Sequence, residues 1–199
     1  MASQLCFVLG GVRSGKSAFA ESRVASLDQP TLYVATGLAV DDEMKERIQR
    51  HRESRPSHWS TLEEPTKLAE KLAPLLRGPG RPGAVIVDSV DVWVANLLME
   101  HEGATKASGA TEESGATKAS IEETVMAETC KLLRLAAESA QAFVIVSSEV
   151  GLSLVPPEPL GRRFQDVLGM VNQKIAADAT EVFLVVAGLP NRIKPVGAE

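Results

Sequence analysis

The sequence predicts an α/β protein in which a mostly parallel sheet is covered by helices on both faces. Strand-like and helix-like segments alternate along the 199 residues. The strand-like runs are apolar throughout, which is typical of strands buried on both faces. The length suits one domain, and the 44% hydrophobic content is enough for a sizeable core.

The expected elements follow from short apolar runs and from apolar residues at helical spacing. The predicted strands span residues 4–9, 31–36, 84–88, 143–148 and 181–186. The predicted helices span residues 15–26, 41–54, 65–76, 90–99, 121–141 and 160–179. The second helix begins with the acidic residues of DDE, which the helix dipole favours in a first turn. It is expected to end at Arg55, because a residue before proline is disfavoured in the α region.

Residues 101–120 do not fit this alternation. The segment GATKAS at 103–108 recurs letter for letter at 115–120, with GATEES between the two copies. Small polar residues bury too little apolar area to offset the entropy of ordering them. We therefore predict a flexible or weakly helical surface insertion within a single domain that spans residues 1–199. A docking arm is the alternative interpretation.

Charge and cysteine content narrow the class of protein. The net charge is −5 and the pI is about 5.4, which argues against a nucleic-acid-binding surface. Cys6 and Cys130 lie in apolar periodic segments, so we expect two buried, reduced thiols rather than a disulfide. The apolar run 5–9 is too short for a signal peptide or a membrane span. A cytoplasmic protein without a membrane span is expected.

The most informative motif is GGVRSGKS, which lies between the first predicted strand and the first predicted helix. It matches the Walker A pattern of P-loop nucleotide-binding proteins. Glycines allow backbone N–H groups to surround phosphate oxygens, and the following helix contributes its positive N-terminal end. Lys16 is expected to reach the β- and γ-phosphates. The predicted phosphate-binding residues are Gly10, Gly11, Val12, Arg13, Ser14, Gly15, Lys16 and Ser17. The fold is thus expected to be P-loop NTPase-like, of the RecA-like kind.

Such a loop requires Mg²⁺, and two residues are candidates to bind it. The Ser17 hydroxyl is the first predicted ligand, and Asp88 is the second because it ends the apolar run AVIVD. The alternative for Asp88 is a helix N-cap. Glu149 ends the next predicted strand in the same way, and it either faces the same crevice or is a solvated loop acid.

A histidine in the second predicted helix is a candidate nucleophile. His51 has arginines at positions 47, 50, 52 and 55 around it, which could form a phosphate-binding patch. A neutral imidazole there could attack a nucleotide α-phosphate. From the spacing alone, a solvated basic helix face is the favoured interpretation.

Taken together, these motifs resemble the bifunctional adenosylcobinamide kinase/adenosylcobinamide-phosphate guanylyltransferases of cobalamin biosynthesis. The matching stretches are GGVRSGKS at 10–17, LYVAT at 32–36, DDEMKERIQRHRESRPSHW at 41–59, AVIVDSVDVWVANLL at 84–98 and the segment 147–188. The patterns R-H-R-x-x-R-P-x-H-W and E-V-G-x-x-x-V-P, in this order, are the specific part. The resemblance covers the chain except for about residues 103–120.

The resemblance implies two reactions. A kinase step would phosphorylate the hydroxyl of the aminopropanol arm of adenosylcobinamide, and a second step would transfer GMP from GTP to that phosphate and release pyrophosphate. By resemblance, His51 carries the GMP. Lys16 of the Walker A motif is the other expected catalytic residue. The chain departs from the family at Arg50, where a histidine is frequent, and at Asp88, where glutamate is frequent.

The resemblance also implies further ligands and partners. The residues expected to contact GTP outside the loop are Ala35, Thr36, Gly37, Arg52, Glu53, Ser54, Arg55, Glu63 and Asp88. Mg²⁺ is the expected cofactor, GTP and ATP are the expected nucleotides, and a homo-oligomer, specifically a trimer, is expected. Two alternatives stay open: a P-loop kinase of another small molecule without a covalent step, and a regulatory nucleotide-binding switch.

Overall fold

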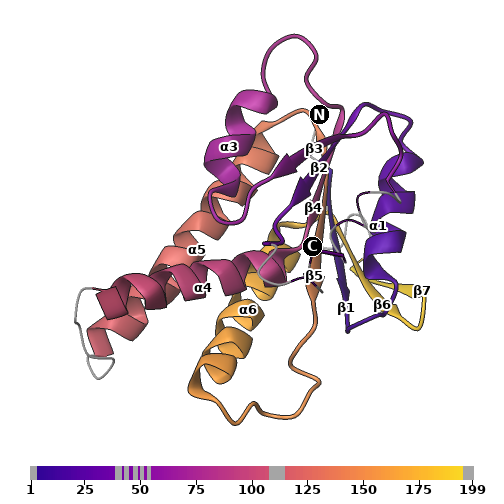
Figure 1. The fold of residues 1–199 in the computed structure, drawn as a ribbon. Helices are drawn as coiled ribbons and strands as arrows, with labels where there is room; N and C mark the ends of the chain where they lie inside the picture. Colours follow the sequence, from indigo (N-terminus) through magenta and orange to yellow (C-terminus); the bar gives the residue numbers. More distant parts are fainter. Residues whose placement is uncertain are drawn as a thin grey trace.

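A seven-stranded sheet with strand order β3-β2-β4-β5-β1-β6-β7 forms the centre of the protein (Figure 1). The computed structural model describes residues 4–38, 42, 45, 46, 49, 52, 55–107 and 115–194. The strands are β1 Leu5–Gly10, β2 Thr31–Ala35, β3 Ser60–Glu63, β4 Ala84–Asp88, β5 Ala142–Ser148, β6 Glu181–Val186 and β7 Leu189–Lys194. Neighbouring strands run parallel, except that β7 is antiparallel to β6. The predicted α/β class with a mostly parallel sheet is confirmed.

Helices cover both faces of the sheet, as predicted. The described helices are α1 Lys16–Ala25, α3 Leu68–Leu75, α4 Val90–Ala107, α5 Gly115–Glu138 and α6 Pro159–Asp178. Figure 1 shows α1 on one face, with α3, α4, α5 and α6 on the other. Within the described residues, none of the helices combines the length and the apolar content that crossing a membrane would require.

Each face of the sheet has its own apolar layer, because side chains alternate along a strand. Phe7 of β1 is fully buried in the layer under α4, α5 and α6. Its neighbour Val8 is fully buried in the layer under α1, together with Ala20 and Val24 of that helix. Burial of both alternating positions explains why these strands are apolar throughout.

Two strands were not predicted. In β3, three of four residues are exposed, and in β7 five of six are exposed, so neither has an apolar pattern. Both are edge strands of the sheet. Edge strands need to cover only a small apolar area, and they tolerate a proline such as Pro190.

The repeat segment is partly helical. The backbone of α4 continues through Ala107 and that of α5 begins at Gly115, while residues 108–114 lie outside the described part of the chain. Flexibility of this insertion stays a prediction. The expectation of two buried thiols is half right: both cysteines are free and Cys6 is buried, but Cys130 is only partly buried because it lies toward the surface of α5.

Candidate active site

The Walker A residues form a tight bend between β1 and α1. The bend is closed by hydrogen bonds from the Ser14 N–H to the Gly11 carbonyl at 3.2 Å and from the Gly188 N–H to the Ser14 carbonyl at 2.8 Å. Arg13 and Gly15 have left-handed backbone conformations, with φ of 55° and 93°. The Lys16 ammonium lies across the bend, 3.3 Å from the Gly11 carbonyl. The chain thus has the wrapped backbone that phosphate binding requires.

Two of the three glycines of this bend are required, each for a different reason. A Cβ on Gly10 would overlap the Ser14 Oγ and lie 2.8 Å from the Val185 carbonyl. Gly15 needs its positive φ. A Cβ on Gly11 would have no heavy atom within 4 Å, so this side of the bend is open.

The N-terminus of α1 is suited to an anion. Its N-cap is Gly15, which contributes no side-chain hydrogen bond, and the first turn contains no acidic residue. The first N–H groups of a helix lack partners within the helix and attract negative charge. The Ser14 Oγ beside them is buried and has no hydrogen-bond partner. This set of donors can bind phosphate oxygens.

Asp88 lies at the carboxyl end of β4, on the face of the sheet that α1 covers. Tyr33 of β2 donates a hydrogen bond from its Oη to the Asp88 Oδ2 at 2.5 Å. Burial, and next the charge of Asp88, raise the pKa of the Tyr33 hydroxyl far above its usual value, so Tyr33 remains a donor. Because α1 packs across β4 and β5, this carboxylate lies on the same side of the sheet as the helix that carries Ser17.

Thr36 holds β2 against the turn that follows β4. It is fully buried, its Oγ1 donates to the Ser89 carbonyl at 2.8 Å, and it accepts from the Ser89 N–H at 2.9 Å. Asn96 of α4 donates to the Thr36 carbonyl at 2.8 Å. The Thr36 side chain therefore fixes the carboxyl ends of two strands, and its hydroxyl is already bonded within the protein.

The segment after the second strand brings further predicted residues to this region. The guanidinium of Arg55 lies 3.6 Å from the centre of the Tyr33 ring. Arg52 forms an ion pair with Glu63 of β3, with 3.3 Å between Nη1 and Oε1. Both of these side chains are more than half exposed, so the pair contributes little to stability.

The structure describes only some of the other predicted residues. His51, Glu53 and Ser54 lie outside the described residues. Of the predicted helix 41–54, the described residues 42, 45, 46, 49 and 52 are helical. Glu149 accepts a hydrogen bond from the Gly151 N–H at 2.7 Å, so its carboxylate is part of a local turn.

Glu21 lies near Asp88, and the sequence did not point to this position. It is half-buried on α1, and burial, followed by the charge of Asp88, raises its pKa, while Arg55 opposes this shift. In the sequence it resembles any acid on a helix surface. Only the packing of α1 across β4 reveals that it is close enough to Asp88 to feel its charge.

The donor set fits Mg²⁺. Among the residues that the structure describes, no cluster of three or more His, Cys, Asp or Glu side chains could hold a metal ion by itself. Mg²⁺ prefers hard oxygen ligands and commonly binds one or two protein groups, with phosphates and waters completing its shell. The Ser17 hydroxyl and the Asp88 carboxylate are ligands of this kind.

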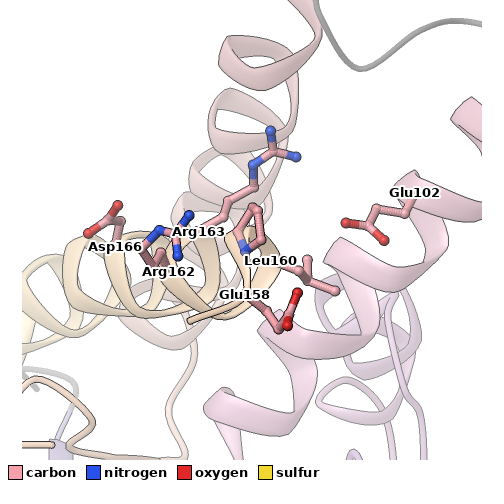
Figure 2. A pocket seen from close by; sticks show the side chains of 7 residues that line it. Glu102, Glu158, Leu160, Arg162, Arg163 and Asp166 are labelled. Atoms are coloured by element: carbon pink, nitrogen blue, oxygen red, sulfur yellow. The ribbon is translucent and has the colours of Figure 1, made fainter. Parts of the chain in front are cut away.

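A separate cavity of about 450 Å³ lies between α4 and the start of α6. Its lining residues are Glu102, Glu158, Pro159, Leu160, Arg162, Arg163 and Asp166. Figure 2 shows Glu102 reaching from α4 toward the first turn of α6, where Glu158 and Leu160 lie. None of these residues belongs to the Walker A bend, so this cavity is distinct from the predicted phosphate site.

Comparison with known proteins agrees with the family that the sequence resembles. Residues 6–193 match the family described as "Cobinamide kinase / cobinamide phosphate guanyltransferase". The chain is 37% identical over 191 residues to the "Bifunctional adenosylcobalamin biosynthesis protein CobU" of Escherichia coli, covering 96% of this chain and 99% of that protein. It is 36% identical to the protein of the same name from Salmonella typhimurium, covering 96% and 99%. It is 37% identical to "Bifunctional adenosylcobalamin biosynthesis protein CobP" of Pseudomonas aeruginosa, covering 94% and 95%.

Proposed function

The chain belongs to the cobinamide kinase / cobinamide phosphate guanyltransferase family, and from this membership we propose that one nucleotide site at residues 10–17 serves both reactions. The chain is thus a bifunctional enzyme of adenosylcobalamin biosynthesis. The observation that best supports a nucleotide site here is the closed bend in front of the α1 N-terminus, which lacks a side-chain cap. The adenosylated form of cobinamide is the proposed substrate.

In the kinase step, the hydroxyl oxygen of the aminopropanol arm bonds to the γ-phosphorus of ATP or GTP. The bond from that phosphorus to the bridging oxygen breaks, the nucleoside diphosphate leaves, and the hydroxyl proton is lost to solvent or to a carboxylate. We assign the charge stabilisation to Lys16 and to the N–H groups of α1. Bound between Ser17 and Asp88, Mg²⁺ would neutralise charge on the phosphate oxygens.

In the guanylyl step, we propose that His51 attacks the α-phosphorus of GTP and that pyrophosphate leaves. The phosphate of cobinamide phosphate then displaces the histidine, which forms the new phosphoanhydride and restores the imidazole. Splitting one displacement into two in this way is ordinary nucleophilic catalysis. Arg52 and Arg55, which follow His51 closely in sequence, are proposed to neutralise the α-phosphate charge.

A labelling experiment tests the covalent step. Incubation with GTP labelled at the α-phosphate should leave base-stable, acid-labile label on the protein, because phosphoramidates have that stability. His51→Ala should abolish the label and keep kinase activity. His58→Ala is the matched control, because His58 is turned edge-on to Trp59 with ring centres 6.5 Å apart and has no proposed role. Full labelling of His51→Ala would show that the nucleophile is another residue.

Lys16→Ala tests whether one phosphate site serves both reactions. Both activities should fall together, because the same ammonium would contact the phosphates in each step. Loss of only one activity would require a second nucleotide site.

We also propose, from the family resemblance, that the protein is a trimer. Light scattering after size-exclusion chromatography measures the number of subunits directly.

A further inference from the structure

We propose that Tyr33 is a positioning residue for Asp88, and that Arg55 holds the Tyr33 ring in place for this role. The inference rests on the proposed function of Asp88 as a metal-binding carboxylate. It extends that function to a tyrosine that neither the motifs nor the comparisons single out.

The register of the sheet places the two side chains together. Tyr33 of β2 is opposite Ile86 of β4, and Asp88 is two residues further along β4, on the same face. The tyrosine is 1% exposed, so its ring is fixed in the layer under α1. Its hydroxyl reaches toward the strand end and donates to the Asp88 Oδ2 at 2.5 Å.

This hydrogen bond determines how Asp88 presents its oxygens. A carboxylate at the end of a strand can rotate about its Cβ–Cγ bond and present either oxygen to a ligand. With Oδ2 bonded to Tyr33, rotation is restricted and Oδ1 is the oxygen left for a cation. Partners of this kind, which hold metal ligands in place, contribute strongly to metal affinity.

Arg55 fixes the tyrosine in turn. Its guanidinium lies 3.6 Å from the ring centre, and its Nε is buried without a hydrogen-bond partner, so the cation stacks on the ring. Trp59 also stacks against Tyr33, with ring centres 6.4 Å apart and an angle of 28° between the planes. The ring thus connects Asp88 to the residues that directly follow the proposed nucleophile segment.

The test compares Tyr33→Phe with Asp88→Asn in the full chain. Phenylalanine keeps the ring and removes only the hydroxyl. The measurement is Mn²⁺ affinity by electron paramagnetic resonance, at saturating non-hydrolysable GTP analogue, together with the Mg²⁺ dependence of the kinase step. We expect Tyr33→Phe to weaken Mn²⁺ binding by about 10- to 100-fold and to recover activity at high Mg²⁺.

Thr129→Val is the matched control, because it also removes a buried hydroxyl. The Thr129 Oγ1 donates to the Val125 carbonyl within α5 at 2.8 Å, and α5 takes no part in the site. This variant should keep wild-type metal affinity, since loss of a buried hydroxyl elsewhere affects only stability. A shift of the same size in both variants would show a general structural effect and overturn the inference.

The remaining outcomes separate the two proposals. Wild-type metal affinity in folded Tyr33→Phe, with a loss in Asp88→Asn, overturns the role of Tyr33 alone. Wild-type affinity in Asp88→Asn overturns the metal role of Asp88 itself. If Tyr33→Phe does not fold, Arg55→Lys decides the matter, because lysine keeps the charge and loses planar stacking. Unchanged Mn²⁺ affinity in Arg55→Lys would then overturn the inference.

Discussion

Two neighbouring glycines of the Walker A bend should respond oppositely to the same substitution. Gly10→Ala adds a methyl group that overlaps the Ser14 Oγ and lies 2.8 Å from the Val185 carbonyl. The Ser14 side chain can rotate, but the carbonyl belongs to the backbone of β6, which is paired with β1 at this position. Gly11→Ala adds the same methyl group where no heavy atom lies within 4 Å.

The expected magnitudes follow from these contacts. Forcing a methyl group into a packed region costs about 1–3 kcal/mol, which for a chain of this size lowers Tm by roughly 2–12 °C. Gly11 has no positive φ, so alanine fits its backbone. Gly11→Ala should therefore unfold at the wild-type temperature or be up to about 1 kcal/mol more stable, because alanine restricts the unfolded chain.

Thermal and urea unfolding without nucleotide measure this difference, and titration of a fluorescent GTP analogue measures binding. Gly10→Ala should lose both stability and affinity. In Gly11→Ala, any loss of affinity with full stability must come from the open side of the bend, where the ligand would lie. Equal stability of the two variants would show that the crowding at Gly10 does not exist in solution, and the steric reasoning would be wrong.

Two further predictions concern titratable groups. Burial, with a smaller effect from Glu181, raises the pKa of Cys6 to about 12. Iodoacetamide at pH 8 should therefore modify only Cys130 in the folded chain. Mass spectrometry that finds both thiols modified would contradict this prediction. Burial and Asp88 raise the pKa of Glu21 above its ordinary value of 4.5, so the folded state binds a proton more tightly than the unfolded state, and stability is lost as pH rises above that value. Glu21→Gln should therefore raise the free energy of unfolding at pH 7.5, and this advantage should vanish as the pH is lowered through about 4.5. Urea titration at both values measures it, and an advantage that grows in acid would reverse the assigned sign.

Physical reasons separate what the sequence could predict about the fold from what it could not. The strands β1, β2, β4, β5 and β6 were predicted to within about two residues, because burial on both faces requires an apolar run. The edge strands β3 and β7 lack that requirement and so lack the pattern. The helical ends of the repeat segment agree with the weakly helical form of the predicted insertion, because Ala and Lys favour a helical backbone even where little apolar area is buried.

The same distinction applies to the candidate site: its local motif could be predicted from the sequence, and its long-range contacts could not. The Walker A bend is local in sequence, so a motif of eight residues was sufficient to predict its tight backbone, while phosphate binding there stays a prediction. The contact between Tyr33 and Asp88 depends on the register between β2 and β4, which are about fifty residues apart. In the sequence Tyr33 is one more apolar member of TLYVAT, and nothing local distinguishes it. The proximity of Glu21 to Asp88 depends on how α1 packs on the sheet, so the sequence could not predict it either.

The hydrogen bond from the Gly188 N–H to the Ser14 carbonyl has a consequence for biogenesis. The strands on either side of β1 are β5 and β6, which the ribosome makes only after more than a hundred further residues. An emerging N-terminal half therefore carries a complete glycine-rich sequence without the neighbours that shape it. Capacity to hold nucleotide should arise late and abruptly during translation, when the chain has passed residue 188.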